Sequence, residues 1–366
     1  MANAGIPLTK EAAFESLRNF FREKPLVFFG SGMSCALDDR FSMRQLAKVL
    51  VDNVPPLLAS IREKEEWKAV LDGLYKGKDL ESAMNSVLDQ NLVEKITEVA
   101  GGFISKASHD CCLKIVNGKS EWPAGELLKV LVDTLPEADR ILNVVTPNYD
   151  LVMEYACEHI GVPYTNGFSG GVMRTIDWHA SEQSMLISTR TVFSNRVKYL
   201  TGVRKHIRLY KVHGSVNYFT FGTKVIENNE WMLDPPGFVQ RVMITPGVSK
   251  HEKLHLYRQE LLKRADEAIE QESRFLFLGY GFNDVHLEKY IRGKLIEQAS
   301  HGLIITRDSS PRIQAVLDAA PNVWLVCKGA GPTKQTIISN SISGSLCLED
   351  SELWDVKEFK KEIIGG

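Results

Sequence analysis

Four short segments, far apart in the chain, carry residue types that together could process a nucleotide. They are Gly30-Ser31-Gly32-Met33-Ser34, Thr146-Pro147-Asn148-Tyr149-Asp150, Val212-His213-Gly214-Ser215 and Gly279-Tyr280-Gly281-Phe282-Asn283-Asp284. Three of them follow a short apolar run. Because the carboxyl ends of parallel strands meet at one edge of a sheet, where α/β proteins bind ligands, we expect a common nucleotide pocket there.

The first glycine segment suits a phosphate. Gly30 and Gly32 let the backbone approach a phosphate group and direct amides toward it, with Ser31 and Ser34 as neighbouring hydroxyls. Cys35 stands where the dehydrogenase fingerprint has its third glycine, which disfavours a hydride-transfer enzyme. The alternative reading of this segment is a plain tight turn.

Asn148 and His213 are the candidate catalytic residues. Thr146, Asn148 and Asp150 lie where a strand meets a helix, so Asn148 or Asp150 could instead cap that helix. His213 ends another strand, and Gly214 leaves room for a ligand beside the imidazole. Histidine is the side chain best suited to move a proton near neutral pH.

The composition of the whole chain excludes several classes of protein. Its 366 residues are 44% hydrophobic and 25% charged, with a formal net charge of -2, which gives no evidence for direct nucleic-acid binding. No apolar run is long enough to span a membrane and no signal peptide is recognisable, so we expect a cytoplasmic protein. None of the six cysteines forms a Cys-x-x-Cys pair, so no metal site is predicted; reduced, mostly buried thiols are the simplest reading.

Hydrophobic patterns predict an α/β protein with a doubly wound parallel, Rossmann-like sheet. Strands are expected at 26–29, 141–145, 207–212, 241–245, 274–278, 303–306 and 323–326, and helices at 9–23, 251–272, 284–298 and from Pro311. A hairpin is expected around 218–231, with its polar turn at Glu227-Asn228-Asn229.

The same patterns suggest how the chain is divided. The expected parts are an N-terminal helix at 1–24, a nucleotide-binding domain at 25–328 and a tail at 329–366 with helical potential only near its end. Within the domain we expect a helical insertion at about 42–140 and a small insertion at about 161–206.

Taken together, the four segments resemble the sirtuin superfamily in order and spacing. The resemblance covers roughly residues 25–330. It implies that the glycine loop holds the diphosphate of NAD, that Asn148 orients the ribose or the attacking water, and that His213 acts as a base. It also implies NAD contacts for the remaining candidate residues, which are Gly30, Ser31, Gly32, Ser34, Thr146, Asp150, Gly279, Gly281, Asn283 and Asp284.

The chain also departs from the protein deacetylases of that superfamily. It lacks their four-cysteine zinc module, and Pro147 stands where they have a glutamine. This combination resembles the zinc-free, sirtuin-like branch of bacterial antiphage defence. The resemblance implies an NAD⁺ hydrolase that releases nicotinamide and ADP-ribose, using NAD as substrate and no metal. The alternatives are a non-catalytic module that senses NAD or ADP-ribose, and a protein deacylase.

Regulation is expected because uncontrolled hydrolysis of NAD is incompatible with growth. Members of the branch are often triggered by assembly or by partner subunits, including a translocase-type ATPase of the HerA kind. The resemblance therefore implies a homo-oligomer with a possible ATPase partner. The apolar stripes of 42–140 are candidates for subunit contacts.

Overall fold

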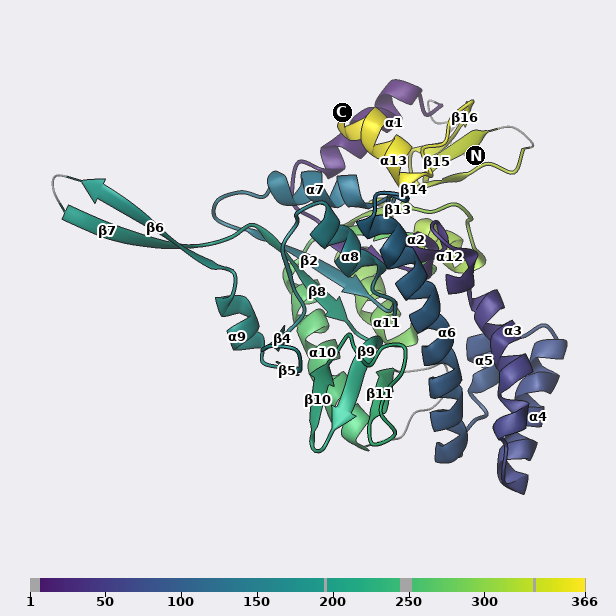
Figure 1. The fold of residues 1–366 in the computed structure, drawn as a ribbon. Helices are drawn as coiled ribbons and strands as arrows, with labels where there is room; N and C mark the ends of the chain where they lie inside the picture. The colour runs from purple at the N-terminus through teal and green to yellow at the C-terminus, as the bar shows by residue number, and fades with distance from the viewer. Residues whose placement is uncertain (1–6, 194–195, 244–251, 332–333, 366) are drawn as a thin grey trace.

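The computed structural model describes residues 7–193, 196–243, 252–331 and 334–365. Within these ranges the centre is a nine-stranded sheet with the strand order β16-β15-β14-β13-β12-β1-β2-β8-β3 (Figure 1). Strands from β14 to β3 run parallel to their neighbours, whereas β15 and β16 are antiparallel. The mostly parallel sheet confirms the predicted fold class.

Six of the predicted strands form the parallel part of this sheet. They are β1 (Leu26–Phe29), β2 (Ile141–Thr146), β8 (His206–Lys211), β12 (Arg274–Leu278), β13 (His301–Ile305) and β14 (Val323–Lys328), with the short β3 (Tyr164–Thr165) beyond β8. The chain passes from β1 through β2 to β8 on one side, then returns to β12 on the other side of β1. The winding direction therefore changes between β1 and β12, the point where doubly wound sheets open a crevice for ligands.

Helices cover both faces of the sheet. In β1, Val27 and Phe29 join one hydrophobic cluster, whereas Leu26 and Phe28 join another. The first cluster includes residues of α1 (Lys10–Phe20), α6 (Gln90–Val116), α7 (Gly125–Asp133) and α8 (Val152–His159). The second includes residues of α10 (Glu252–Gln271), α11 (Val285–Arg292) and α12 (Pro311–Ala319). Burial on both faces explains why β1 reads as a continuous apolar run.

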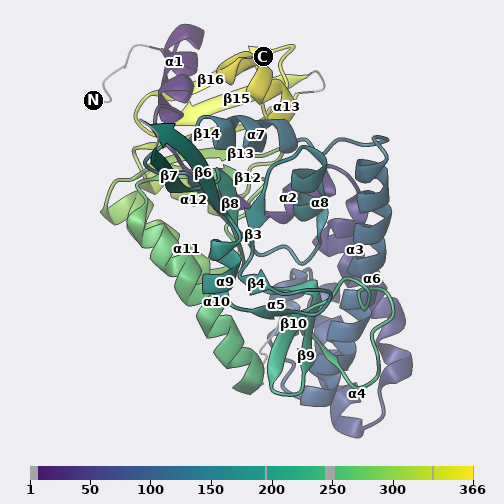
Figure 2. The ribbon, with the colours of Figure 1, turned by 60° about the vertical axis from the view of Figure 1, so that its left-hand side comes forward.

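The stretch 42–140 is helical up to β2, as predicted. Between the short α2 (Ser31–Cys35) and α6 lie α3 (Met43–Asn53), α4 (Ile61–Tyr75) and α5 (Leu80–Met84). Local signals fix where α4 begins, because Ser60 and Glu63 form a reciprocal capping box there. These helices group along one side of the molecule (Figures 1 and 2).

A second, five-stranded sheet combines two strands that precede β8 in the chain with three that follow it. Its order is β11-β9-β10-β5-β4, with β4 (Phe168–Ser169), β5 (Arg174–Ile176), β9 (Gly214–Phe221), β10 (Lys224–Glu227) and β11 (Gln240–Met243). The β9–β10 hairpin turns at 222–223, so the predicted turn at Glu227-Asn228-Asn229 is wrong. Glu227 is instead buried and paired with Arg174, so these polar residues belong to an internal network. Positions 244 and 245 of the predicted strand lie outside the described residues.

Residues 161–206 include β3, β4 and β5, the helix α9 (Trp178–Gln183) and a long hairpin. This hairpin consists of β6 (Leu186–Phe193) and β7 (Arg196–Val203) and projects from the body of the molecule, at the left of Figure 1. We call β6 and β7 the arm.

The C-terminal segment contains strands that the sequence patterns did not predict. β15 (Gln335–Asn340) and β16 (Gly344–Glu349) extend the central sheet at its edge. β15 alternates buried and half-buried residues and β16 is largely exposed, so neither strand forms the continuous apolar run of the buried strands, which explains the weak sequence signal. The helix predicted near the end is present as α13 (Val356–Phe359) followed by a π-helical turn, Lys360–Ile364. Among the described helices, none has the length and apolar character needed to cross a membrane.

Candidate active site

The glycine turns after β1 and β12 pack directly against each other. A Cβ atom at Gly30 would lie 2.1 Å from the carbonyl oxygen of Gly279, and one at Gly32 would lie 2.9 Å from the Cα of Gly279. Gly279 itself has φ +55°, a left-handed conformation that favours glycine. The three glycines therefore allow two loops to approach each other at the switch point of the sheet.

Hydrogen bonds join the same two turns. The Gly30 amide donates to the Leu278 carbonyl at 3.0 Å, and the Gly32 amide donates to the Gly279 carbonyl at 3.1 Å. Gly30 is buried, whereas Ser31 and Gly32 are exposed. Two of the amides expected at a phosphate thus bind the neighbouring turn, and the exposed part of the loop is Ser31-Gly32.

Asn148 is held by contacts from the β1 loop. Its Nδ2 donates to the Gly30 carbonyl and to the Ser34 hydroxyl, each at 3.1 Å. Thr146 Oγ1 accepts from the Asn148 amide at 3.1 Å and donates to the Phe29 carbonyl at 3.0 Å. The side chain of Asn148 is half-buried and fixed in orientation by two neighbouring strands, as a positioning residue requires.

Asp150 contacts both this network and the first amide of α8. Its Oδ2 accepts from the Ser34 hydroxyl at 2.8 Å, and its Oδ1 accepts from the Val152 amide at 3.1 Å. Asp150 thus accepts hydrogen bonds from Ser34 and from Val152, while the N-cap position of α8 is Leu151. Ser34 is 2% exposed and bonded to both Asn148 and Asp150, so it links the two residues.

A buried lysine lies beneath this segment and was missed by sequence reasoning. Lys211 Nζ lies 2.6 Å from Glu154 Oε1 and 2.5 Å from the Asp150 carbonyl oxygen. Both side chains are almost fully buried, and burial raises the pKa of Glu154 although the Lys211 charge opposes that rise. The sequence signal that could have indicated this pair is a lysine at the end of an apolar strand. Such a lysine is expected to be buried, and a buried charge requires a partner.

His213 pairs with Asp284. His213 Nε2 lies 2.5 Å from Asp284 Oδ2, and the two side chains are 19% and 10% exposed. Asp284 Oδ1 also accepts from the Leu287 amide at 2.9 Å and so caps α11. Asp284, predicted as an NAD contact, is thus a carboxylate that fixes one ring nitrogen of the candidate base.

The His213 loop is also tied to the Asn148 segment. The Tyr149 carbonyl accepts from the Ser215 hydroxyl and from the Val216 amide, both at 3.0 Å. The ring centroids of Tyr149 and His213 are 6.3 Å apart. Gly214 is required here because a Cβ would lie 2.0 Å from the Val242 carbonyl oxygen. These contacts bring the two candidate catalytic residues into one region.

Glu81 contributes a second carboxylate to this region. It lies on α5, in the helical stretch, and interacts electrostatically with His213 and Asp284. Burial, together with the negative charge of Asp284, raises the pKa of Glu81. No local pattern distinguishes this glutamate from its exposed neighbours, so the sequence could not single it out.

The remaining candidates lie at the rim. Gly281 is half-buried, and Asn283 is exposed. The carbonyl oxygen of Asn283 accepts a hydrogen bond from Arg312 at 3.3 Å. No contact among the described residues connects Gly281 or the Asn283 side chain to Asn148 or His213. Among the described residues, no group of three or more His, Cys, Asp or Glu side chains is arranged to hold a metal ion.

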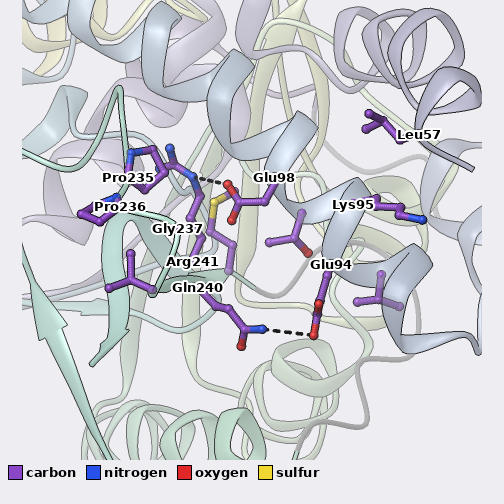
Figure 3. A pocket seen from close by; sticks show the side chains of 13 residues that line it. Leu57, Glu94, Lys95, Glu98, Pro235, Pro236, Gly237, Gln240 and Arg241 are labelled. Carbon is purple, nitrogen blue, oxygen red and sulfur yellow. Dashed lines mark hydrogen bonds and ion pairs between the residues drawn. The ribbon is translucent and has the colours of Figure 1, made fainter. Parts of the chain in front are cut away.

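A pocket of about 450 Å³ lies between α6 and residues 235–243 (Figure 3). Arg241 forms part of its wall and is buried, donating to the Val216 and Met232 carbonyls and to Glu98. Gln240 pairs with Glu94 across the opening, as Figure 3 shows. The described lining contains no residue of the four predicted segments, although Met243 pairs with Gly214 and places the pocket next to them.

The mostly parallel sheet and the reversal of its strand order between β1 and β12 define a Rossmann-like α/β protein. Residues 142–323 match the family model described as SIR2-like domain, a range that includes Asn148, His213 and the β12 glycine turn. The match covers 182 of the 366 residues, and over this range the chain is similar to that family. No curated protein matches the chain.

Among solved structures, one described as "Structural Basis for the Mechanism and Regulation of Sir2 Enzymes" is similar to this chain. The sequence identity is 11% and the TM-score is 0.41, and the alignment covers 85% of this chain and 92% of the other.

Proposed function

We propose that this protein is an NAD⁺ glycohydrolase that cleaves the bond between nicotinamide and ribose. The observation that carries the proposal is the convergence of an oriented Asn148 and a carboxylate-paired His213 beside the switch point of the sheet. The SIR2-like match supports NAD as the substrate, because it indicates an NAD-using enzyme at the level of the family. We propose no metal requirement.

Binding of NAD would use the paired glycine turns. The exposed Ser31-Gly32 segment offers close approach to a diphosphate, and Gly279 and Gly281 offer the same on the facing turn. Since Nδ2 of Asn148 donates to Gly30 and Ser34, its Oδ1 is the atom that accepts from a ribose hydroxyl or from water. Asn148 would thus orient the reacting ribose.

The chemical step would resemble glycoside hydrolysis. The C–N bond between ribose and nicotinamide breaks, neutral nicotinamide leaves with the electron pair, and the sugar passes through an oxocarbenium-like state. A water oxygen then bonds to the anomeric carbon, and the water proton passes to His213. Asp284 stabilises the imidazolium that forms, since its carboxylate already lies 2.5 Å from Nε2.

The biological setting belongs to the same proposal. Depletion of NAD on infection would stop phage replication along with growth of the host, as in abortive infection. Activity would then be restrained until a trigger arrives, with a translocase-type ATPase subunit as one candidate partner.

Identification of the products tests the proposal. We expect the purified chain, incubated with NAD, to release nicotinamide and ADP-ribose in equal amounts, as measured by liquid chromatography. If calorimetry shows that NAD binds but no nicotinamide is released under any condition tested, the chain is a sensing module. Release of nicotinamide only when an acylated peptide is present would instead assign a deacylase.

A further inference from the structure

The arm presents an apolar face with no cover in the described part of the chain. In β6, Leu186, Arg190 and Val192 are an even number of residues apart, and Tyr199 of β7 lies opposite Arg190. These side chains therefore share one face of the hairpin. Leu186, Val192 and Tyr199 are 41%, 65% and 69% exposed, and Val192 and Tyr199 are diagonal neighbours on this face.

The contacts that anchor the arm, among the described residues, lie at its base. Arg140 donates to the Val203 carbonyl at 2.9 Å, and the Arg204 amide donates to the Met185 carbonyl at 2.8 Å. Beyond these contacts the two strands project from the body (Figure 1). Because an isolated two-stranded hairpin is marginally stable in water, a projecting hairpin with an apolar face indicates a partner surface.

Charge indicates what kind of surface that partner offers. By sequence, β6 and β7 contain Arg190, Arg196 and Lys198 and no acidic residue. The rest of the chain holds 41 of the 44 basic residues and all 46 acidic ones, a net charge of -5. A second copy of this chain is therefore complementary to the arm in its overall charge.

The β16 edge of the central sheet is the best match on such a copy. β16 is the last strand of the sheet, and Gly344, Ser345, Cys347 and Glu349 are exposed along it. Residues 344–355 contain four acidic residues and no basic one, and Glu349 and Asp350 are exposed. An open edge accepts an added strand from another chain, and an acidic edge favours a basic one.

We infer that the arm of one subunit docks on the β16 edge of a second copy of this chain. The arm and β16 lie on opposite sides of the molecule in Figure 1. The contact is therefore head-to-tail, and repetition of it builds a ring or an open chain.

Covalent trapping tests this contact, because Cys347 on β16 is exposed and unpaired. We expect Tyr199→Cys to form disulfide-linked chains under mild oxidation and Tyr199→Cys with Cys347→Ser to form none. Tyr75→Cys, on α4 and 84% exposed, is the matched control and should stay uncrosslinked. Crosslinks that persist after Cys347→Ser would show that arms pair with arms, and would overturn the proposal.

Light scattering of the full chain gives an independent test. The wild-type chain should be oligomeric, and Val192→Asp with Tyr199→Asp should reduce it to a monomer while circular dichroism stays unchanged. Tyr75→Asp should remain oligomeric. A monomeric wild-type chain at every concentration, or an oligomer that survives the double substitution, would refute the contact. Mass gained only on addition of another protein would assign the arm to a different partner.

Discussion

His213 Nε2 lies 2.5 Å from Asp284 Oδ2, although the strands that precede these residues, β8 and β12, are separated in the sheet by β1 and β2. Three strand spacings amount to roughly 14 Å, so the two loops must converge above the ends of β1 and β2. The pair therefore joins the two halves of the doubly wound sheet at the edge where Asn148 and the glycine turns lie.

This pair predicts a specific effect of Asp284→Asn. The substitution keeps Oδ1 as an acceptor for the Leu287 amide but removes the negative charge beside His213. A general base typically contributes ~10²–10⁴-fold to the rate. We expect kcat for NAD cleavage to fall by less than this full contribution, with little change in KM.

The control for this variant is Asp308→Asn, an exposed aspartate paired with Arg307, which should leave kcat unchanged. An unchanged kcat for Asp284→Asn would show that the carboxylate only caps α11.

The packed glycine turns predict different outcomes at Gly30 and Gly32. A Cβ at Gly30 meets the Gly279 carbonyl at 2.1 Å, so Gly30→Ala should lower the melting temperature by displacing the β12 turn. Gly32 is exposed, but a Cβ there would meet the Cα and carbonyl oxygen of Gly279 at 2.9 Å, so Gly32→Val should lower the melting temperature and also weaken NAD binding, as measured by calorimetry in a His213→Ala background. Gly102→Ala, with no atom within 4 Å of its Cβ, is the control. Unaltered NAD affinity in Gly32→Val would mean that this loop is only a turn.

Removal of one partner of the buried Lys211–Glu154 pair should cause a large loss of stability, and removal of the second partner should restore most of it. Lys211→Met leaves an unpaired buried carboxyl and should cost about 3–5 kcal/mol in the free energy of unfolding. Lys211→Met with Glu154→Leu should recover most of that loss. Lys357→Met, which breaks the exposed pair with Glu121, should have no measurable effect. Equal losses in the single and double variants would contradict this account.

Glu63 predicts a pH dependence of stability. Hydrogen bonds from Lys95 and from the Ser60 and Ala59 amides lower the pKa of Glu63 from 4.5 to about 2. A group with a lowered pKa contributes stability above its unfolded pKa, and this stability is lost as pH falls from about 4.5 toward about 2. Urea unfolding between pH 6 and 3 should therefore show a weaker acid dependence in Glu63→Gln than in the wild type. Glu65→Gln, at an exposed position of α4, should retain the wild-type dependence.

The sequence was informative where local patterns decide structure. Apolar runs in the sequence predict the buried strands, which are β1, β2, β8, β12, β13 and β14. The glycine and polar residues that follow these runs mark the edge of the sheet. Residues brought together from distant parts of the chain were not predictable. Neither the Asp284 pairing with His213 nor the proximity of Glu81 leaves a local signal, because both depend on how the loops pack.

The β15 and β16 strands escaped prediction for a related reason. They lie at the edge of the sheet, where burial imposes little on composition, and their pairing is antiparallel to β14. The hairpin turn was misplaced because Glu227 and Asn228 are polar yet buried, a combination that resembles a turn in sequence. Glu227 bonds Asn166 and Arg174, which are more than fifty residues away in the sequence, so no local pattern reveals its burial.

The most direct test of the account is nicotinamide release from NAD by matched variants of the full chain. We expect release by the wild type, and none above background by His213→Ala or Asn148→Ala, with both variants retaining the wild-type melting temperature. Lys357→Met should match the wild type. Near wild-type release by folded His213→Ala would contradict the central claim, since the proton would then be taken by another group.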